Sequence, residues 1–150
     1  MRLIELTADR ADETLEIGAE MHRLGVYKDW PLDRGQALHI IKALIMSPAA
    51  MTVGVETEDG VLVGAMMGEV QRDLWVDVKV AVEYGVYVTE AYRGSAAGVR
   101  MIRHFEKWAE TQGADVIRQS VYAGIDNDGA GAVFSRLGYE TAGAIYKKVI

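Results

Sequence analysis

A run of small residues lies where a strand pattern meets a helix pattern in the middle of the chain. The segment reads Arg93-Gly94-Ser95-Ala96-Ala97-Gly98. The first turn of a helix has backbone N–H groups without intrahelical partners and carries the positive end of the helix dipole. The glycines and alanines leave the approach to these groups open, and Ser95 could add a hydroxyl, so the segment is suited to binding phosphate. A turn that needs small residues only for close packing would have the same composition.

The elements around this turn predict a mixed α/β (α+β) fold in one domain of residues 1–150. Hairpin strands come first and a strand-helix-strand crossover follows, which gives a mixed sheet with helices on its faces. Strands are expected at Arg2–Leu6, Met51–Thr57, Val61–Gln71, Lys79–Thr89, Asp115–Ala123 and Ala144–Val149. Helices are expected from Thr7 as cap to Leu24, from Asp33 as cap to Ser47, over Ser95–Gln112 and over Gly129–Leu137.

Composition excludes several classes of function. The net charge is −6, whereas nucleic-acid-binding proteins carry a basic surface, so we do not expect a nucleic-acid-binding protein. Charged residues interrupt the N-terminal segment, and the apolar runs are shorter than the roughly 20 residues that span a bilayer, so we expect no signal peptide and no membrane span. The chain has no cysteine, which is compatible with a cytoplasmic protein. His22, His39 and His104 are scattered without metal-ligand spacing, so we expect no metal.

Two spaced motifs lie on either side of the predicted strand at Asp115–Ala123. The first is Ala91-Tyr92-Arg93-Gly94-Ser95-Ala96, with Gly98 following, and the second consists of Asn127, Ala130, Phe134 and Gly138-Tyr139. With these two motifs the chain resembles the GNAT superfamily of acyl-CoA-dependent N-acyltransferases, whose first signature is Gln/Arg-x-x-Gly-x-Gly/Ala. The resemblance implies a mostly antiparallel sheet with a splayed parallel strand pair at its centre, and acetyl-CoA as co-substrate.

The resemblance also places the coenzyme. It puts the pyrophosphate on the turn from Arg93 through Ala97 and Gly98 to Val99, and it gives Asn127, Ala130 and Phe134 a place in the same site. A glycine inside a strand marks a bulge or a close backbone approach, and Gly85 lies in such a strand. In the family the pantetheine arm lies beside the splayed strand, which here places Val86, Tyr87 and Val88 along the arm and residues 121–127 on the other wall.

Glu83 is the expected general base. A lysine-like amine has a pKa of about 10.4, so a proton must leave before its nitrogen attacks the thioester. Glu83 lies just before Gly85, at about the place where several family members carry a catalytic glutamate. An exposed strand glutamate paired with a lysine is the alternative. Secondary candidates that could attract a cationic acceptor are Glu69, Asp73 and Asp77.

The sequence departs from the family pattern at two positions. Ala91 stands where the signature has Gln or Arg, so one polar contact near the pyrophosphate is missing. Phe134 stands where many relatives have a tyrosine that protonates the leaving thiolate, and a phenyl ring has no proton to donate. Tyr139, Tyr122 or a water molecule could take that role. A coenzyme A thiol with a pKa of about 8.5 can also leave partly as thiolate.

The leading functional prediction is an N-acetyltransferase that acts directly, in a ternary complex, on a small amine or a protein amino group. The alternatives are a catalytically silent acyl-CoA-binding module and a purely structural domain. Candidate walls of an acceptor pocket are Tyr27, Trp30 and Trp75. A homodimer would fit the family, and no nucleic acid or membrane partner is expected.

Overall fold

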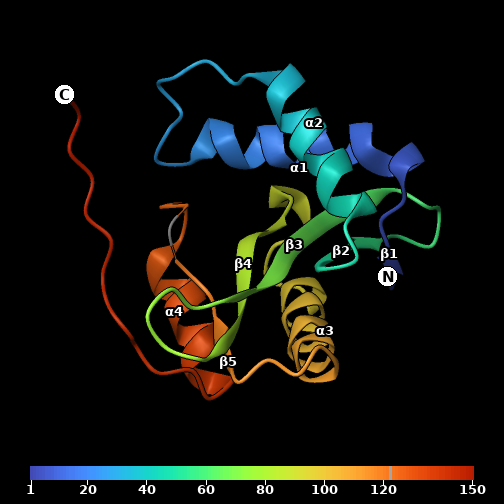
Figure 1. Ribbon diagram of the computed structural model, residues 1–150. Helices are drawn as coiled ribbons and strands as arrows, with labels where there is room; N and C mark the ends of the chain where they lie inside the picture. Colours follow the sequence, from blue (N-terminus) through green and yellow to red (C-terminus); the bar gives the residue numbers. More distant parts are fainter. Residues whose placement is uncertain (122) are drawn as a thin grey trace.

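The computed structural model describes residues 1–121 and 123–150, and in these residues it contains a five-stranded mixed sheet between two layers of helices (Figure 1). The strands are β1 (Arg2–Glu5), β2 (Ala50–Glu56), β3 (Leu62–Arg72), β4 (Lys79–Val88) and β5 (Val116–Arg118). The α-helices are α1 (Ala11–Leu24), α2 (Arg34–Met46), α3 (Ala97–Thr111) and α4 (Asn127–Arg136). Two short 3₁₀ turns, η1 (Ala8–Arg10) and η2 (Glu90–Tyr92), precede α1 and α3.

The strands follow one another across the sheet in the order β1-β2-β3-β4-β5. All neighbouring pairs are antiparallel except β4 and β5, which run parallel. The parallel pairing joins only Val80–Val82 to Val116–Arg118, although β4 continues to Val88. The two strands therefore separate beyond Val82, as the sequence predicts. The predicted central position of the pair is wrong in the described residues, because β5 is the last strand of the sheet and no strand forms beyond it.

A β-bulge lies on β4 at the point of separation. Met67 of β3 pairs with Gly85, and the next β3 residue, Gly68, pairs with Glu83, so Tyr84 is left as the extra residue. A bulge re-aims the side chains beside it and bends the strand. The expectation of a bulge or a close approach at Gly85 is confirmed.

The larger core lies between the sheet and α3. The buried residues of α3 recur at helical spacing on one face: Ala97, Met101, Ile102, Phe105 and Ala109. A Cβ at Gly68 would come within 2.7 Å of the Phe105 ring and of the Val82 carbonyl, so this glycine lets α3 approach the sheet closely. On the opposite face, α1 and α2 pack on two smaller apolar clusters.

Several predicted boundaries are wrong. Thr7 does not cap α1 with its side chain, because η1 intervenes and α1 begins at Ala11. By contrast, Asp33 caps α2 as expected by accepting from the Gln36 N–H at 2.9 Å. The helix α4 begins at Asn127 rather than Gly129, because Asp126 accepts from the Gly129 N–H at 3.0 Å.

Two of the predicted strands also differ from the structure, one in length and one because it is not formed. The strand β5 covers only Val116–Arg118 of the predicted Asp115–Ala123, as the chain leaves β4 there. The predicted final strand Ala144–Val149 is not formed, and residues 140–150 are exposed. Lys147 interrupts the face of Ile145 and Val149, and Lys148 interrupts the alternate face, so neither face is continuously apolar.

Candidate active site

The turn before α3 leaves backbone N–H groups available to an anion. Gly94 has φ +75°, which favours glycine, and a Cβ built there would meet no atom within 4 Å. The Ala97 N–H donates to Ser95 Oγ at 3.3 Å, and the first backbone bond along the helix runs from the Arg100 N–H to the Ala96 carbonyl at 2.9 Å. The N–H groups of Gly98 and Val99 have no acceptor among the described residues. An anion can therefore approach two free donors at the positive end of the helix.

The side chains of Tyr87 and Arg93 tie this turn to α1. The Tyr87 hydroxyl donates to Glu20 Oε1 at 2.9 Å, and the Glu90 N–H donates to the same oxygen at 2.9 Å. The Arg93 guanidinium donates to the Tyr87 hydroxyl and lies 5.2 Å from the ring centroid. Burial raises the pKa of Tyr87, and the Glu20 carboxylate adds to this shift. The side chains of Tyr87 and Arg93 thus hold the turn in place against α1.

Sequence reasoning missed Glu20. It lies 67 residues from Tyr87 and 70 residues from Glu90 along the chain, so no local pattern connects them.

The strand β4 presents unpaired backbone beside the turn. Beyond Val82 its β5-facing edge has no strand partner among the described residues. A Cβ at Gly85 would meet only the side chain of Met21, at 3.8 Å, so the space above this glycine is open. Val86 and Val88 pack toward the α3 core. A free strand edge of this kind can hydrogen-bond an extended polar chain as an added strand would.

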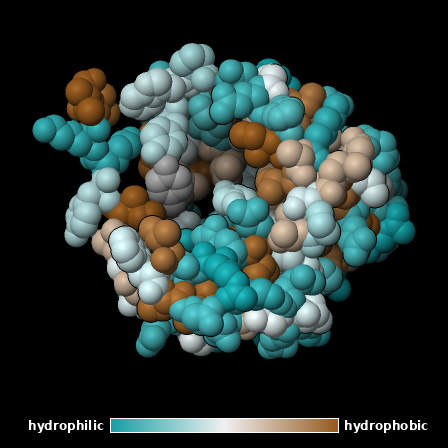
Figure 2. Space-filling view, viewed as in Figure 1, coloured by the Kyte–Doolittle hydropathy of each residue, from teal (hydrophilic) through white to brown (hydrophobic). Residues whose placement is uncertain are grey.

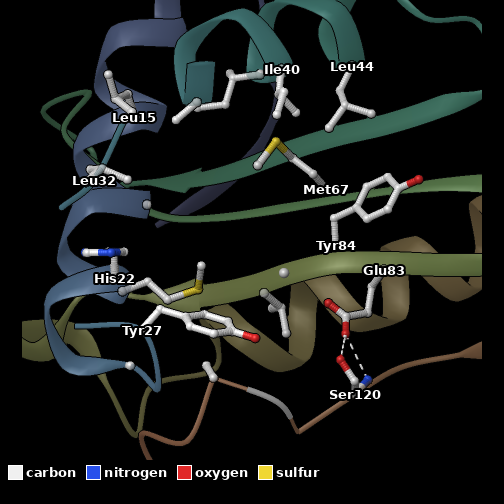
Figure 3. A pocket seen from close by; sticks show the side chains of 18 of the residues that line it. Leu15, His22, Tyr27, Leu32, Ile40, Leu44, Met67, Glu83, Tyr84 and Ser120 are labelled. Carbon is white, nitrogen blue, oxygen red and sulfur yellow. Dashed lines mark hydrogen bonds between the residues drawn. The ribbon is translucent and has the colours of Figure 1, made fainter. Parts of the chain in front are cut away.

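Glu83 lies at the start of this gap and is only 7% exposed (Figure 3). Its Oε1 accepts two hydrogen bonds from Ser120, one from the backbone N–H at 2.8 Å and one from the hydroxyl at 2.6 Å. Burial raises the pKa of the Glu83 carboxyl, and the two Ser120 bonds oppose that shift. The predicted pairing of Glu83 with a lysine is not what the structure shows. A desolvated carboxylate with a raised pKa is a stronger base than a glutamate in water.

Ser120 is the second residue that sequence reasoning missed. It directly follows a glutamine just after β5, and it comes one position before the predicted wall of residues 121–127. Polar residues directly after the parallel partner strand are the signal that could have found it.

Glu83 borders a cavity of about 700 Å³ between the sheet and helices α1 and α2. The space-filling view shows a hollow on the face seen in Figure 1, with hydrophobic residues along part of its rim (Figure 2). The sheet contributes Met67, Glu83, Tyr84, Gly85 and Val86, and the segment after β5 contributes Ser120 and Ala123. The helices and their connection contribute Leu15, Gly18, Met21, His22, Gly25, Val26, Tyr27, Leu32, Ala37, Ile40, Ile41 and Leu44.

Aromatic rings lie at the α1–α2 connection, as predicted for an acceptor pocket. Tyr27 lines the cavity, and its ring meets that of Trp30 edge-on at 6.0 Å between centroids. Lys147 of the C-terminal segment donates to the Val26 carbonyl at 2.7 Å, and its ammonium lies 5.5 Å from the Tyr27 centroid and 5.8 Å from that of Trp30. Trp75, also predicted as a wall, lies 87% exposed between β3 and β4 and does not line this cavity.

The secondary carboxylates have contacts of their own. Glu69 accepts from the Tyr84 hydroxyl, and burial together with this carboxylate raises the pKa of Tyr84 to about 12. Asp73 accepts from the N–H groups of Trp75 and Val76, within the β3–β4 connection. Asp77 pairs with Arg72 at the surface. None of these three carboxylates lines the cavity described here.

The second motif forms α4. Asn127 is the first residue of the helix, Ala130 follows within it, and Phe134 is 9% exposed in the α3 core. The Phe134 ring meets the Tyr139 ring edge-on at 5.5 Å. Burial and the Glu106 carboxylate raise the pKa of Tyr139 above its ordinary value, and the Gln119 side-chain amide donates to its hydroxyl at 2.7 Å. Tyr139 therefore holds its proton firmly, which disfavours it as the acid. Tyr122 lies outside the described residues.

Among residues 1–121 and 123–150, no group of three or more histidine, aspartate and glutamate side chains is arranged to hold a metal ion. In the same residues no helix is both long and apolar enough to cross a membrane.

The fold is a mixed sheet whose parallel strand pair opens beside the N-terminus of α3, with the buried Glu83 carboxylate at the opening. The chain belongs to the acetyltransferase (GNAT) family, whose model matches residues 13–139. It is therefore an acyltransferase, and acetyl-CoA is the co-substrate of this family. The predicted family and fold are confirmed.

Solved structures share this fold at low sequence identity. A protein from Bacillus halodurans is 13% identical, with 100% of both chains covered and a TM-score of 0.84. An acetyltransferase from Trypanosoma brucei is 16% identical, with 99% of both chains covered and a TM-score of 0.74. An aminoglycoside antibiotic 6′-N-acetyltransferase from Acinetobacter baumannii is 18% identical, with 99% of this chain and 98% of the other covered and a TM-score of 0.75. No curated protein matches in sequence.

Proposed function

We propose that the chain transfers an acetyl group from acetyl-CoA directly to a primary amine, with Glu83 as the general base. The observation that carries this proposal is the position of the Glu83 carboxylate. It lies where β4 and β5 separate, and it also borders the cavity beneath α1 and α2. A base at that point is between the two places where a thioester and an amine would bind.

The residues present fit the coenzyme. The open turn at Gly94 and the free N–H groups of Gly98 and Val99 suit a pyrophosphate, and the unpaired edge of β4 around Val86 suits the amides of a pantetheine arm. Bound there, the coenzyme supplies an activated thioester. The further assignments of Ala130 and Phe134 to this site remain proposals that rest on the family motif.

The chemistry is a direct displacement. Glu83 takes a proton from the ammonium, the amine nitrogen forms a bond to the thioester carbonyl carbon, and the carbon–sulfur bond breaks. The nitrogen then gives up its second proton to water, and coenzyme A leaves as a thiolate that is protonated from the solvent, because Phe134 cannot donate a proton. The chain has no cysteine, so no cysteinyl acyl intermediate forms.

Phe134 also favours a second candidate function, a module that binds acyl-CoA without turnover. One experiment separates the two. Binding of acetyl-CoA is measured by calorimetry, and release of coenzyme A thiol is measured with a broad panel of primary amines. Amine-dependent thiol supports the enzyme, whereas binding without thiol from any amine supports the silent module.

A further inference from the structure

The cavity beside Glu83 has mostly apolar walls. From α1 come Leu15 and Met21, and from α2 come Ile40, Ile41 and Leu44, while Met67 faces them from the sheet (Figure 3). Ile40 is 47% exposed although it lies on the cavity side of α2. Exposed aliphatic groups on a concave wall gain free energy when a ligand covers them.

The cavity lining contains little negative charge that could pair with a second cation. Glu83 is the one carboxylate among the described residues that line it. The remaining polar side chains on the lining are His22, Tyr27, Tyr84 and Ser120. The hydroxyl of Tyr84 is already bonded to Glu69, and that of Ser120 is bonded to Glu83. A second ammonium carried deep into this space would have no second carboxylate among the lining residues to pair with, and an unpaired charge away from water is unfavourable.

Two glycines, Gly18 and Gly85, leave space in the cavity because they have no side chain. A Cβ at Gly18 of α1 would meet nothing within 4 Å, and Gly85 of β4 also lacks a side chain at the cavity wall. The resulting volume of about 700 Å³ is that of a small-molecule site rather than of a narrow channel for one side chain. A lysine side chain of a protein would leave the α2 wall uncovered.

We propose that the acceptor is a small primary amine carried on an apolar alkyl or arylalkyl body. The amine lies at Glu83, and the apolar body fills the space between α1, α2 and β3. This inference rests on the proposed function and selects one acceptor class within it. Polyamines, amino sugars and lysine side chains of proteins are excluded as preferred acceptors.

The first test compares acceptors on the unmodified protein. Amine-dependent thiol release is measured with n-propylamine, n-hexylamine, phenethylamine, ethanolamine, spermidine and a lysine-containing peptide. We expect kcat/KM to rise several-fold for each added methylene that the cavity buries. Hexylamine and phenethylamine should then exceed ethanolamine and spermidine by about tenfold or more. Equal or higher values for spermidine or the peptide would overturn the proposal.

A matched pair of variants locates the apolar body. Ile40→Lys and Met46→Lys make the same change on the same helix, and both original side chains are exposed, but only Ile40 lines the cavity. We expect Ile40→Lys to lower kcat/KM for hexylamine by about tenfold or more, and Met46→Lys to leave it unchanged. Equal effects of the two variants would contradict the assignment of the α2 wall.

A size series at Gly18 gives an independent check. Both Gly18→Ala and Gly18→Leu favour the helix, so α1 is expected to stay folded. Gly18→Leu should reduce the activity with phenethylamine much more than the activity with propylamine, and Gly18→Ala should reduce the activity with phenethylamine by less than Gly18→Leu does. A loss that is equal for the two amines would contradict the proposal.

Equilibrium binding separates this proposal from the proposed function. Binding of hexylamine and spermidine is measured by calorimetry in the presence of coenzyme A, which permits no transfer. Hexylamine binding that is lost in Ile40→Lys supports the acceptor class even if no amine is acetylated, in which case only the proposed function fails. Tighter binding of spermidine than of hexylamine overturns the acceptor class even if turnover is found.

Discussion

Ser120 donates two hydrogen bonds to one carboxylate oxygen of Glu83, at 2.8 Å from its backbone N–H and 2.6 Å from its hydroxyl. The pair connects β4 to the chain that leaves β5, across the point where the strands separate. Both bonds stabilise the ionised carboxylate, and burial favours the protonated form more strongly, so the pKa of Glu83 is raised. The balance between these two effects sets the pH range in which Glu83 is a base.

Glu83→Gln should lower kcat by about 10²–10⁴ with little change in coenzyme affinity, because an amide cannot accept the proton but its oxygen can still accept both bonds from Ser120. The measurement is thiol release beside calorimetry with acetyl-CoA. The comparison variant is Glu69→Gln, which removes the carboxylate that Tyr84 contacts. If Glu69→Gln abolishes turnover and Glu83→Gln does not, the base is misassigned.

The pH dependence of stability has a definite sign. Because the pKa of Glu83 is higher in the folded protein than in the unfolded chain, its contribution to stability is fully present below the unfolded pKa. The contribution is lost as pH rises through the folded pKa. Melting curves of the wild type should show this loss, and those of Glu83→Gln should lack it. Identical pH profiles for the two proteins would contradict the raised pKa.

Ser120→Ala should move the acidic limb of the rate profile to higher pH. In the wild type, the hydrogen bond from the Ser120 hydroxyl lowers the pKa of Glu83. The variant keeps the bond from the backbone N–H but loses the hydroxyl bond, so the pKa of Glu83 rises. At high pH, where Glu83 is ionised in both proteins, kcat should change by less than about tenfold. A uniform loss at every pH would indicate a structural role for Ser120 instead.

Gly94→Asp should weaken acetyl-CoA binding by about tenfold or more, because it adds a carboxylate to the turn whose free N–H groups, at Gly98 and Val99, are proposed to bind the pyrophosphate. Gly60→Asp is the matched control. Gly60 has φ +82° against +75° at Gly94, and a Cβ at either position meets nothing within 4 Å, so backbone strain and added charge are alike. Coenzyme affinity measured by calorimetry should fall only in the Gly94 variant. A similar loss in both would attribute the effect to strain or net charge.

Local sequence features predicted the parts of the fold where one residue type has a single physical role. Gly85 indicated the bulge, the small residues around Gly94 indicated the open turn, and Asp33 indicated the start of α2. These features need only neighbours in the sequence. The bonds from Ser120 to Glu83 and from Tyr87 to Glu20 join residues 37 and 67 positions apart, so only the assembled sheet brings them together.

Aromatic residues show the limit of pattern reasoning most clearly. Trp30 and Trp75 both lie in loop segments that contain an aspartate one or two positions before the ring. Of these two, only Trp30 is next to a cavity-lining ring, that of Tyr27. Trp75 is held at the surface by a turn whose N–H bonds to Asp73. Trp30 lies in the connection between α1 and α2 and Trp75 in the connection between β3 and β4, so only the assembled fold distinguishes them.

Phe134→Tyr tests whether departure of the thiolate limits turnover. We expect kcat near neutral pH to change by less than about threefold, because a thiol with a pKa of about 8.5 leaves without a dedicated acid. The added hydroxyl enters a buried site and should cost about 1–3 kcal/mol if it finds no partner. Turnover and melting temperature are measured on the same preparation. A large gain in kcat would show that the natural protein lacks an effective proton donor.

Acetyl-CoA should stabilise the folded chain in a manner that depends on the whole coenzyme. A ligand that binds only the native state at about 100 times its Kd adds about 2.7 kcal/mol. Each kcal/mol raises the melting temperature of a domain of this size by roughly 2–4 °C, so the expected shift is about 5–10 °C.

An adenosine phosphate without pantetheine should give a smaller shift, because it reaches the turn at Gly94 but not the open edge of β4. Since the chain has no cysteine, any thiol that appears on adding an amine comes from coenzyme A. Equal shifts with both ligands would mean that the β4 edge binds nothing, and no shift with either would remove the coenzyme site from this turn.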